Sequence, residues 1–157
     1  MSTLAGAAAA AAAWIFNRLA LKIFGPPVII YIVPLVEELA KTGLAVLFNA
    51  SIIMVHVSFG LIEGIYDFFY TVGEYKRSCG IKKANAGTSC QRSLFNARKT
   101  GLSAGLVSLA GHLLYGLVTA WAFTQSGQIA VGVAGGYLVH MLWNLVVMRF
   151  LAHKKEC

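Results

Sequence analysis

Four of the six acidic residues of this 157-residue sequence lie inside apolar stretches. They are Glu37, Glu38, Glu63 and Asp67. An acidic side chain at the centre of a bilayer costs about 2.5–3.5 kcal/mol on insertion scales, so such residues are expected to face a bundle interior and to have partners. A carboxylate held near water can accept a proton from it, which is the chemistry of a general base. The placement of these acids therefore indicates a functional site.

Basic, imidazole and amide side chains recur at helical spacing around these acids. Glu37 and Lys41 are four residues apart, on one helix face and in the order that favours an ion pair. We expect Lys41 to hold one of the two neighbouring glutamates ionised. His140 and Asn144 are also four residues apart, and His112 lies in another apolar stretch. These side chains can point at one ligand or at one another.

This combination of side chains suits two kinds of hydrolytic site. Neutral imidazoles and carboxylates are ligands of zinc, and a further glutamate can take a proton from the zinc-bound water. A site without metal uses the same groups differently, with a glutamate as general base and His with Asn as donors to an oxyanion. The residue types leave both chemistries open.

The elements that must position these residues are membrane-spanning helices. The sequence is 58% hydrophobic and 12% charged, whereas soluble proteins have about 25% charged residues. Helices of roughly 20 residues fit four or five times into this length. We predict an all-α, polytopic transmembrane helix bundle of four to five spans that forms one membrane domain. The five apolar stretches are 4–22, 27–49, 51–73, 100–123 and 128–150.

The polar residues occupy similar positions along their apolar stretches, so we expect them to lie at a similar depth in the membrane. Glu37 is the eleventh residue of its stretch, and Glu63, His112 and His140 are each the thirteenth of theirs. At about 1.5 Å per helical residue, all four lie near the bilayer midplane whichever way their helices run. Four helices should therefore place polar groups at one level.

The first two stretches carry features that affect the count of spans. Residues 1–24 form a hydrophobic segment with a poly-Ala core, which we take as a span, although an interfacial helix or a cleaved leader remains open. The second stretch follows a Gly-Pro-Pro break at residues 25–27 and contains Pro34. Because proline removes a backbone hydrogen bond, a kink or local unwinding is expected just before the glutamates.

Basic residues are concentrated in a long polar segment, residues 74–99, which has seven Lys or Arg against one Glu. The positive-inside rule predicts a cytoplasmic loop there, with the basic C-terminal tail, residues 151–157, on the same side of the membrane. The formal net charge of +7 then suits anionic lipid head groups, and no nucleic acid is expected. Cys79, Cys90 and Cys157 lie on that reducing side without metal-binding spacing, so we expect free thiols.

Four motifs, each in its own hydrophobic stretch, follow one another within residues 27–150. They are Glu37-Glu38-x-x-Lys41, Phe59-x-x-x-Glu63, His112-x-x-x-Gly116 and His140-x-x-x-Asn144. In this order they resemble the PrsW family of intramembrane proteases, part of the superfamily of CAAX-processing endopeptidases and bacteriocin-immunity-type membrane proteins. The prenyl-processing branch prefers an Arg at the position of Thr42 and a His at the position of Glu63, so the resemblance is to the PrsW-like side.

The resemblance implies a multi-helix, metalloprotease-like hydrolase that cleaves membrane-protein or peptide substrates within or beside the lipid bilayer. The paired glutamates would supply the base that activates water. The expected catalytic residues are Glu37, Glu38, Lys41 and Asn144. The expected ligands of a zinc ion are Glu63, His112 and His140.

Two other functions use the same residues. Buried acids, histidines and a lysine also occur in proton-coupled transporters, and the glycines of the last two stretches would permit a homo-oligomer. A catalytically silent immunity or scaffold protein would keep the motifs as a packing core. A proton path needs polar groups spread along the membrane normal, whereas these groups are expected at one depth. This favours hydrolysis over proton transport.

We expect ordinary roles for two other polar residues. His56 is expected to be a polar residue at a helix end, and Asp67 a supporting or capping group.

Overall fold

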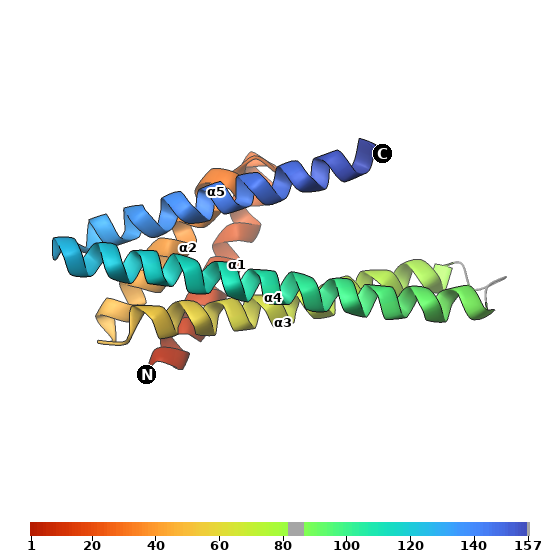
Figure 1. The fold of residues 1–157 in the computed structure, drawn as a ribbon, viewed down its shortest axis with the longest axis horizontal. Helices are drawn as coiled ribbons and strands as arrows, with labels where there is room; N and C mark the ends of the chain where they lie inside the picture. Colours follow the sequence, from red (N-terminus) through yellow and green to blue (C-terminus); the bar gives the residue numbers. More distant parts are fainter. Residues whose placement is uncertain (82–86, 157) are drawn as a thin grey trace. The chain divides into compact units, whose positions relative to one another are not determined.

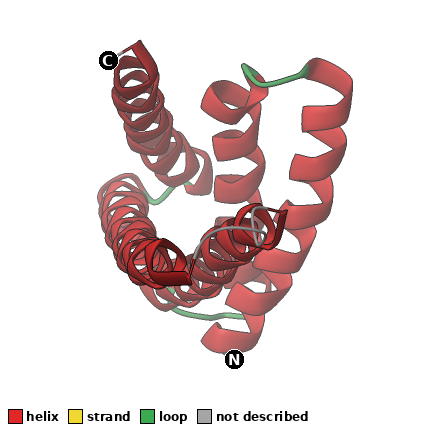
Figure 2. Ribbon diagram, turned by 90° about the vertical axis from the view of Figure 1, so that its right-hand side faces the viewer, coloured by secondary structure: helices red, strands yellow, loops and turns green. Residues whose placement is uncertain are grey.

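The computed structural model describes the backbone of residues 1–81 and 87–156, and the side chains of residues 1–77 and 94–149. Within the described backbone there are five α-helices and no strand (Figures 1 and 2). The helices are α1 (Ser2–Phe24), α2 (Val28–Leu47), α3 (Ile52–Ile81), α4 (Gly87–Ser126) and α5 (Ile129–Glu156). The predicted all-α fold is confirmed, and the five apolar stretches match the five helices in order.

Four helical segments are long and apolar enough to cross a membrane: Ser2–Phe24, Ile52–Arg77, Leu94–Ser126 and Ile129–Arg149. The chain is therefore a multi-pass membrane protein, as its composition predicts. Helix α2 carries three ionisable residues in its 20 residues, so composition alone does not mark it as a span. Its place in the membrane, and the orientation of the polar segment and the C-terminus, stay predictions.

The described backbone of the polar segment at residues 74–99 is helical, although the segment was expected to be a loop. Helix α3 continues to Ile81 and α4 begins at Gly87. The segment contains no proline, and an exposed ion pair of Arg77 with Glu74, 2.7 Å between Nη1 and Oε1, joins side chains one turn apart. Polarity alone does not end a helix whose side chains can be solvated. The side chains of the three cysteines lie outside the described residues, so the prediction of free thiols stays untested.

Helix α2 runs without interruption through Pro34, so the expected local unwinding does not occur. The preceding break is confirmed, because α1 ends at Gly25, whose φ of 75° is easily adopted only by glycine. Helix α2 packs against both α1 and α5. These contacts hold α2 together despite the one backbone hydrogen bond that Pro34 cannot donate.

The chain forms two compact units. The first comprises Met1–Phe59 and Gly111–Cys157, and the second comprises Gly60–Ala110. Six of the seven candidate site residues belong to the first unit: Glu37, Glu38, Lys41, His112, His140 and Asn144. Glu63 belongs to the second unit. Each unit is described separately below.

Small residues bring α1 close to its neighbours in the first unit. Ala5, Ala9 and Ala13 are four residues apart and form one buried face of α1. Ala5 packs in a cluster with Val55, and the other two alanines pack with Phe59. The poly-Ala core is thus a packing surface, on which a short side chain permits close helix approach.

The closest approach of α1 to the start of α3 is at Gly6. A Cβ atom at this position would lie 2.6 Å from the Ser58 Cβ and 2.9 Å from the Val55 carbonyl oxygen. Gly6→Leu is therefore expected to lower the free energy of unfolding by about 1–3 kcal/mol, the usual effect of overpacking. Urea titration in mixed micelles would measure it. Gly43→Leu is the matched control, because a Cβ there meets no atom within 4 Å, and no loss of stability is expected.

Candidate active site

Three ionisable side chains of α2 are buried at the centre of the first unit. Glu37 is 3% exposed, and Glu38 and Lys41 are both 0% exposed. The Lys41 Nζ lies 2.6 Å from Glu38 Oε1 and 3.9 Å from Glu37 Oε2. The ion pair expected from the sequence between residues 37 and 41 is present but long, and the short contact is made with Glu38, three residues before the lysine.

Glu38 is also bound by two histidines from other parts of the chain. His56 Nε2, near the start of α3, lies 2.9 Å from Glu38 Oε2. His140 Nδ1, in α5, lies 3.1 Å from Glu38 Oε1. Together with Lys41, three nitrogen groups therefore surround one carboxylate. Such a network compensates the burial of a charge, which would otherwise be strongly unfavourable.

His56 is part of this cluster, and its expected role as a polar residue at a helix end is wrong. The side chain is fully buried, and its Nδ1 lies 2.9 Å from the Ile52 carbonyl oxygen. A neutral imidazole has only one N–H, whereas both of these partners are acceptors when Glu38 is ionised. Satisfying both contacts requires one more proton on the Glu38–His56 pair.

His56→Phe tests this contact. The variant keeps a ring in the core but leaves a buried Glu38 oxygen without this donor, so the free energy of unfolding should fall by about 1–3 kcal/mol. Met54→Phe, an exposed position in the same helix turn, should change it by less than about 0.5 kcal/mol. Equal stability of both variants in a urea titration would contradict the assigned position of His56.

Lys41 also determines the protonation of His112. The Lys41 Nζ lies 3.1 Å from His112 Nδ1, and an ammonium group can only donate. His112 Nδ1 is therefore the acceptor, and the proton of the neutral imidazole lies on Nε2. The ring of Phe59 packs at 4.9 Å from the His112 ring and also lies 4.6 Å below the Lys41 ammonium. The aromatic surroundings keep this contact away from water.

His140 is held in a fixed orientation between Glu38 and an aromatic ring. Its imidazole is stacked on Tyr115, with ring centroids 4.2 Å apart and an angle of 16° between the planes. The Nδ1–H donates to Glu38, which places Nε2 toward Glu37, at 3.8 Å from Oε2. The His112 and His140 rings lie 5.6 Å apart. Two carboxylates and two imidazoles thus converge, as the spacing predicts.

Two asparagines make side-chain hydrogen bonds in the first unit. Asn17, which the sequence analysis does not single out, donates from Nδ2 to Glu37 Oε1 at 2.8 Å. Asn144, an expected catalytic residue, donates from Nδ2 to the Ile29 carbonyl oxygen at 3.0 Å. This contact joins α5 to the first turn of α2. The sequence signal for Asn17 is only that an amide follows the long apolar run of α1.

Glycines allow the helices to approach this cluster closely. A Cβ at Gly116 would lie 2.7 Å from the Cβ of His56, and a Cβ at Gly136 would lie 2.7 Å from Glu38 Oε2. The glycine of the His112-x-x-x-Gly116 motif therefore makes room for a histidine of another helix.

Glu63 belongs to the second unit. Its side chain is half-buried and accepts a hydrogen bond from Ser108 Oγ, 3.0 Å from Glu63 Oε2. Asp67 is half-buried one turn further along α3. The expected zinc ligands combine Glu63 with His112 and His140 of the first unit, and as a set they stay a prediction.

The contact of Lys41 with His112 bears on the zinc site, which stays a prediction. A zinc-bound imidazole uses a nitrogen without a proton and donates its other N–H to a neighbouring acceptor. At His112, an ammonium at Lys41 donates to Nδ1, so zinc binding through Nε2 would have to displace the proton there. His140 has the opposite arrangement, because its Nδ1–H donates to Glu38. The two histidines are therefore chemically different.

Comparison with protein-family models, curated proteins and solved structures gave no match for this chain. The resemblance to intramembrane proteases therefore rests on the four motifs, and it stays a prediction.

Proposed function

We propose that this protein is an intramembrane endopeptidase that hydrolyses peptide bonds with a glutamate-activated water. One observation carries the proposal. Lys41 Nζ contacts both Glu38 Oε1, at 2.6 Å, and His112 Nδ1, at 3.1 Å. This single cation separates the roles of the remaining groups, since it neutralises one glutamate and makes one histidine a donor through Nε2.

Glu37 is the better candidate for the general base. Glu38 already accepts from Lys41, His56 and His140, so its lone pairs are committed to holding the cluster together. Glu37 is held at Oε1 by Asn17, and its Oε2 lies 3.8 Å from His140 Nε2 and 3.9 Å from Lys41 Nζ. The Asn17 amide and the Lys41 ammonium thus fix the position of this carboxylate.

His112 would act as the electrophilic partner in the reaction. Glu37 takes a proton from water, and the water oxygen forms a bond with the carbonyl carbon of the substrate. The Nε2–H of His112 donates to the oxygen that becomes negative, an interaction that contributes about 2.7–4 kcal/mol in known oxyanion holes. The C–N bond then breaks, and the proton passes from Glu37 to the leaving amine.

Zinc remains the expectation from the family resemblance, and no step above passes through it. Measuring zinc in the purified protein by plasma mass spectrometry tests this reading. If the site works without a metal, the protein should contain less than one zinc per chain, with no change in His112→Ala. Stoichiometric zinc that is lost in His112→Ala and His140→Ala would restore the metal mechanism.

Co-reconstitution with single-span peptides of about 20 apolar residues in ¹⁸O-labelled water tests the function itself. Hydrolysis places one labelled oxygen in each new carboxyl terminus, which mass spectrometry detects. Wild-type protein should produce labelled termini and Glu37→Gln should not. Cleavage without label would exclude an activated water as nucleophile. Proton uptake into vesicles without cleavage would favour the transporter alternative, and neither activity would favour an immunity or scaffold protein.

A further inference from the structure

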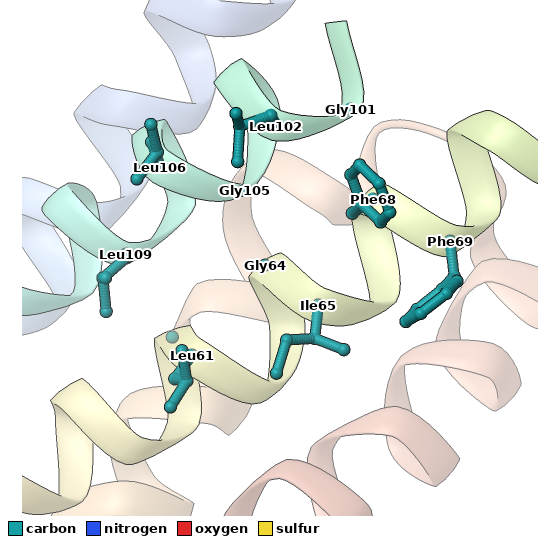
Figure 3. A pocket seen from close by; sticks show the side chains of 11 residues that line it. Leu61, Gly64, Ile65, Phe68, Phe69, Gly101, Leu102, Gly105, Leu106 and Leu109 are labelled. Atoms are coloured by element: carbon teal, nitrogen blue, oxygen red, sulfur yellow. The ribbon is translucent and has the colours of Figure 1, made fainter. Parts of the chain in front are cut away.

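The second unit contains an apolar groove between α3 and α4 (Figure 3). Its volume is about 270 Å³. All lining residues are Gly, Leu, Ile or Phe, and all of them lie within the two segments Ile52–Arg77 and Leu94–Ser126 that are apolar enough to cross a membrane. No polar side chain among them could orient a polar ligand. The groove therefore suits a hydrocarbon.

Glycines form the floor of the groove and larger side chains form its walls. A Cβ at Gly64 would lie 2.7 Å from the Gly105 carbonyl oxygen, so the two backbones are in direct contact there. Leu61, Ile65 and Phe69 recur at four-residue spacing on α3 and are all exposed. Leu102 and Leu106 form the facing row on α4 and are exposed as well. Side chains of both helices therefore border the groove.

The dimensions of the groove favour an acyl chain over a helix. A helix with its side chains is about 10–12 Å across, and a pocket for a drug-sized ligand has about 300–1,000 Å³. A groove of about 270 Å³ is smaller than this range. A single extended hydrocarbon chain is much thinner than a helix, so it can lie in such a groove.

Basic residues beyond one end of the groove indicate which kind of lipid head group would bind there. Arg98 and Lys99 precede Gly101 on α4 by less than one turn, and Lys76 and Arg77 follow Phe69 on α3 by about two turns. All four basic side chains are exposed. Arg77 is paired with Glu74, the one acid among the described side chains of residues 70–77 and 94–101, so this cluster keeps a net positive charge. A basic cluster next to a membrane span attracts anionic lipid head groups.

We propose that this groove binds one acyl chain of an anionic phospholipid, whose head group contacts the basic residues at the end of α3 and the beginning of α4. The proposal does not depend on the hydrolytic function, because every residue in it belongs to the second unit. The lipid would fill the groove and cover the exposed aliphatic rows of both helices. It would also join the two helices where their glycines leave no side chains to pack.

Native mass spectrometry of delipidated protein with phosphatidylglycerol or phosphatidylcholine of identical acyl chains tests the proposal. Wild type should retain one phosphatidylglycerol in preference to phosphatidylcholine. Leu106→Trp, which fills the groove, should lose both lipids, whereas Leu142→Trp, at an exposed position of α5, should retain them. Arg98→Gln should reduce the preference for phosphatidylglycerol by about fivefold, and Arg18→Gln on α1 should not.

Three results would overturn the proposal. Equal retention by wild type and Leu106→Trp would show that the lipid binds elsewhere. Displacement of phosphatidylglycerol by glycerol phosphate would show that the head group binds without the groove. A dimer of the delipidated chain that becomes a monomer in Leu106→Trp would identify a second copy of the protein as the occupant. Thermal unfolding of each variant in detergent would confirm that it is folded.

Discussion

Glu37→Gln is expected to reduce peptide cleavage by about 10²–10⁴-fold, the usual contribution of a general base. Glutamine has nearly the same shape as glutamate and can still accept the hydrogen bond from Asn17 Nδ2, which lies 2.8 Å from Glu37 Oε1. It cannot take a proton from water. The free energy of unfolding should therefore change by no more than about 1 kcal/mol. The rate would be measured with the peptide that is cleaved fastest in the ¹⁸O experiment.

Glu38→Gln is the matched variant, because it makes the same change one residue away. Here the substitution removes a charge that Lys41, His56 and His140 all contact, so stability should fall more than for Glu37→Gln. The two variants thus separate a base from a structural carboxylate. If a folded Glu38→Gln protein were inactive while Glu37→Gln cleaved at the wild-type rate, the two roles would have to be exchanged.

Lys41→Met is expected to cause the largest loss of stability. Methionine fills the space of the lysine stem but leaves two buried glutamates without their cation, and breaking a buried ion pair in this way costs about 3–5 kcal/mol. His112 Nδ1 also loses its donor at 3.1 Å. Urea unfolding in mixed micelles would measure the change.

Two further variants make the result specific. Lys22→Met, at an exposed position in the last turn of α1, should change the free energy of unfolding by less than about 0.5 kcal/mol. The double variant Lys41→Met with Glu38→Gln removes both charges, so it should be more stable than Lys41→Met alone. Lys41→Met with wild-type stability would mean that the lysine does not pair with Glu38 in the membrane.

Composition and spacing were sufficient for the class of the protein and for much of the cluster. A chain with 58% hydrophobic and 12% charged residues has few stable structures other than membrane helices, because lipid cannot satisfy open backbone groups. The buried acids of α2 were predictable for the same reason. His112 and His140 were predictable from their depth, since residues at the same height on packed helices can meet.

Other features depended on contacts that no local pattern encodes. Glu37 and Glu38 lie four and three residues before Lys41, and both spacings permit an ion pair. The choice of Glu38 follows from the additional donors His56 and His140, which belong to other helices. The same holds for Asn17, whose partner Glu37 is 20 residues away.

The sequence by itself determined an all-helical membrane protein whose carboxylates, lysine and histidines need partners, because burial of charge in lipid is too costly to occur without them. The tertiary structure alone decided which partners meet, and with them the tautomer of His112. It also decided the groove between α3 and α4, where Gly64 and Gly105 bring two backbones into contact. A glycine shows where helices can approach, but only the packed structure shows which surfaces do so and what space is left beside them.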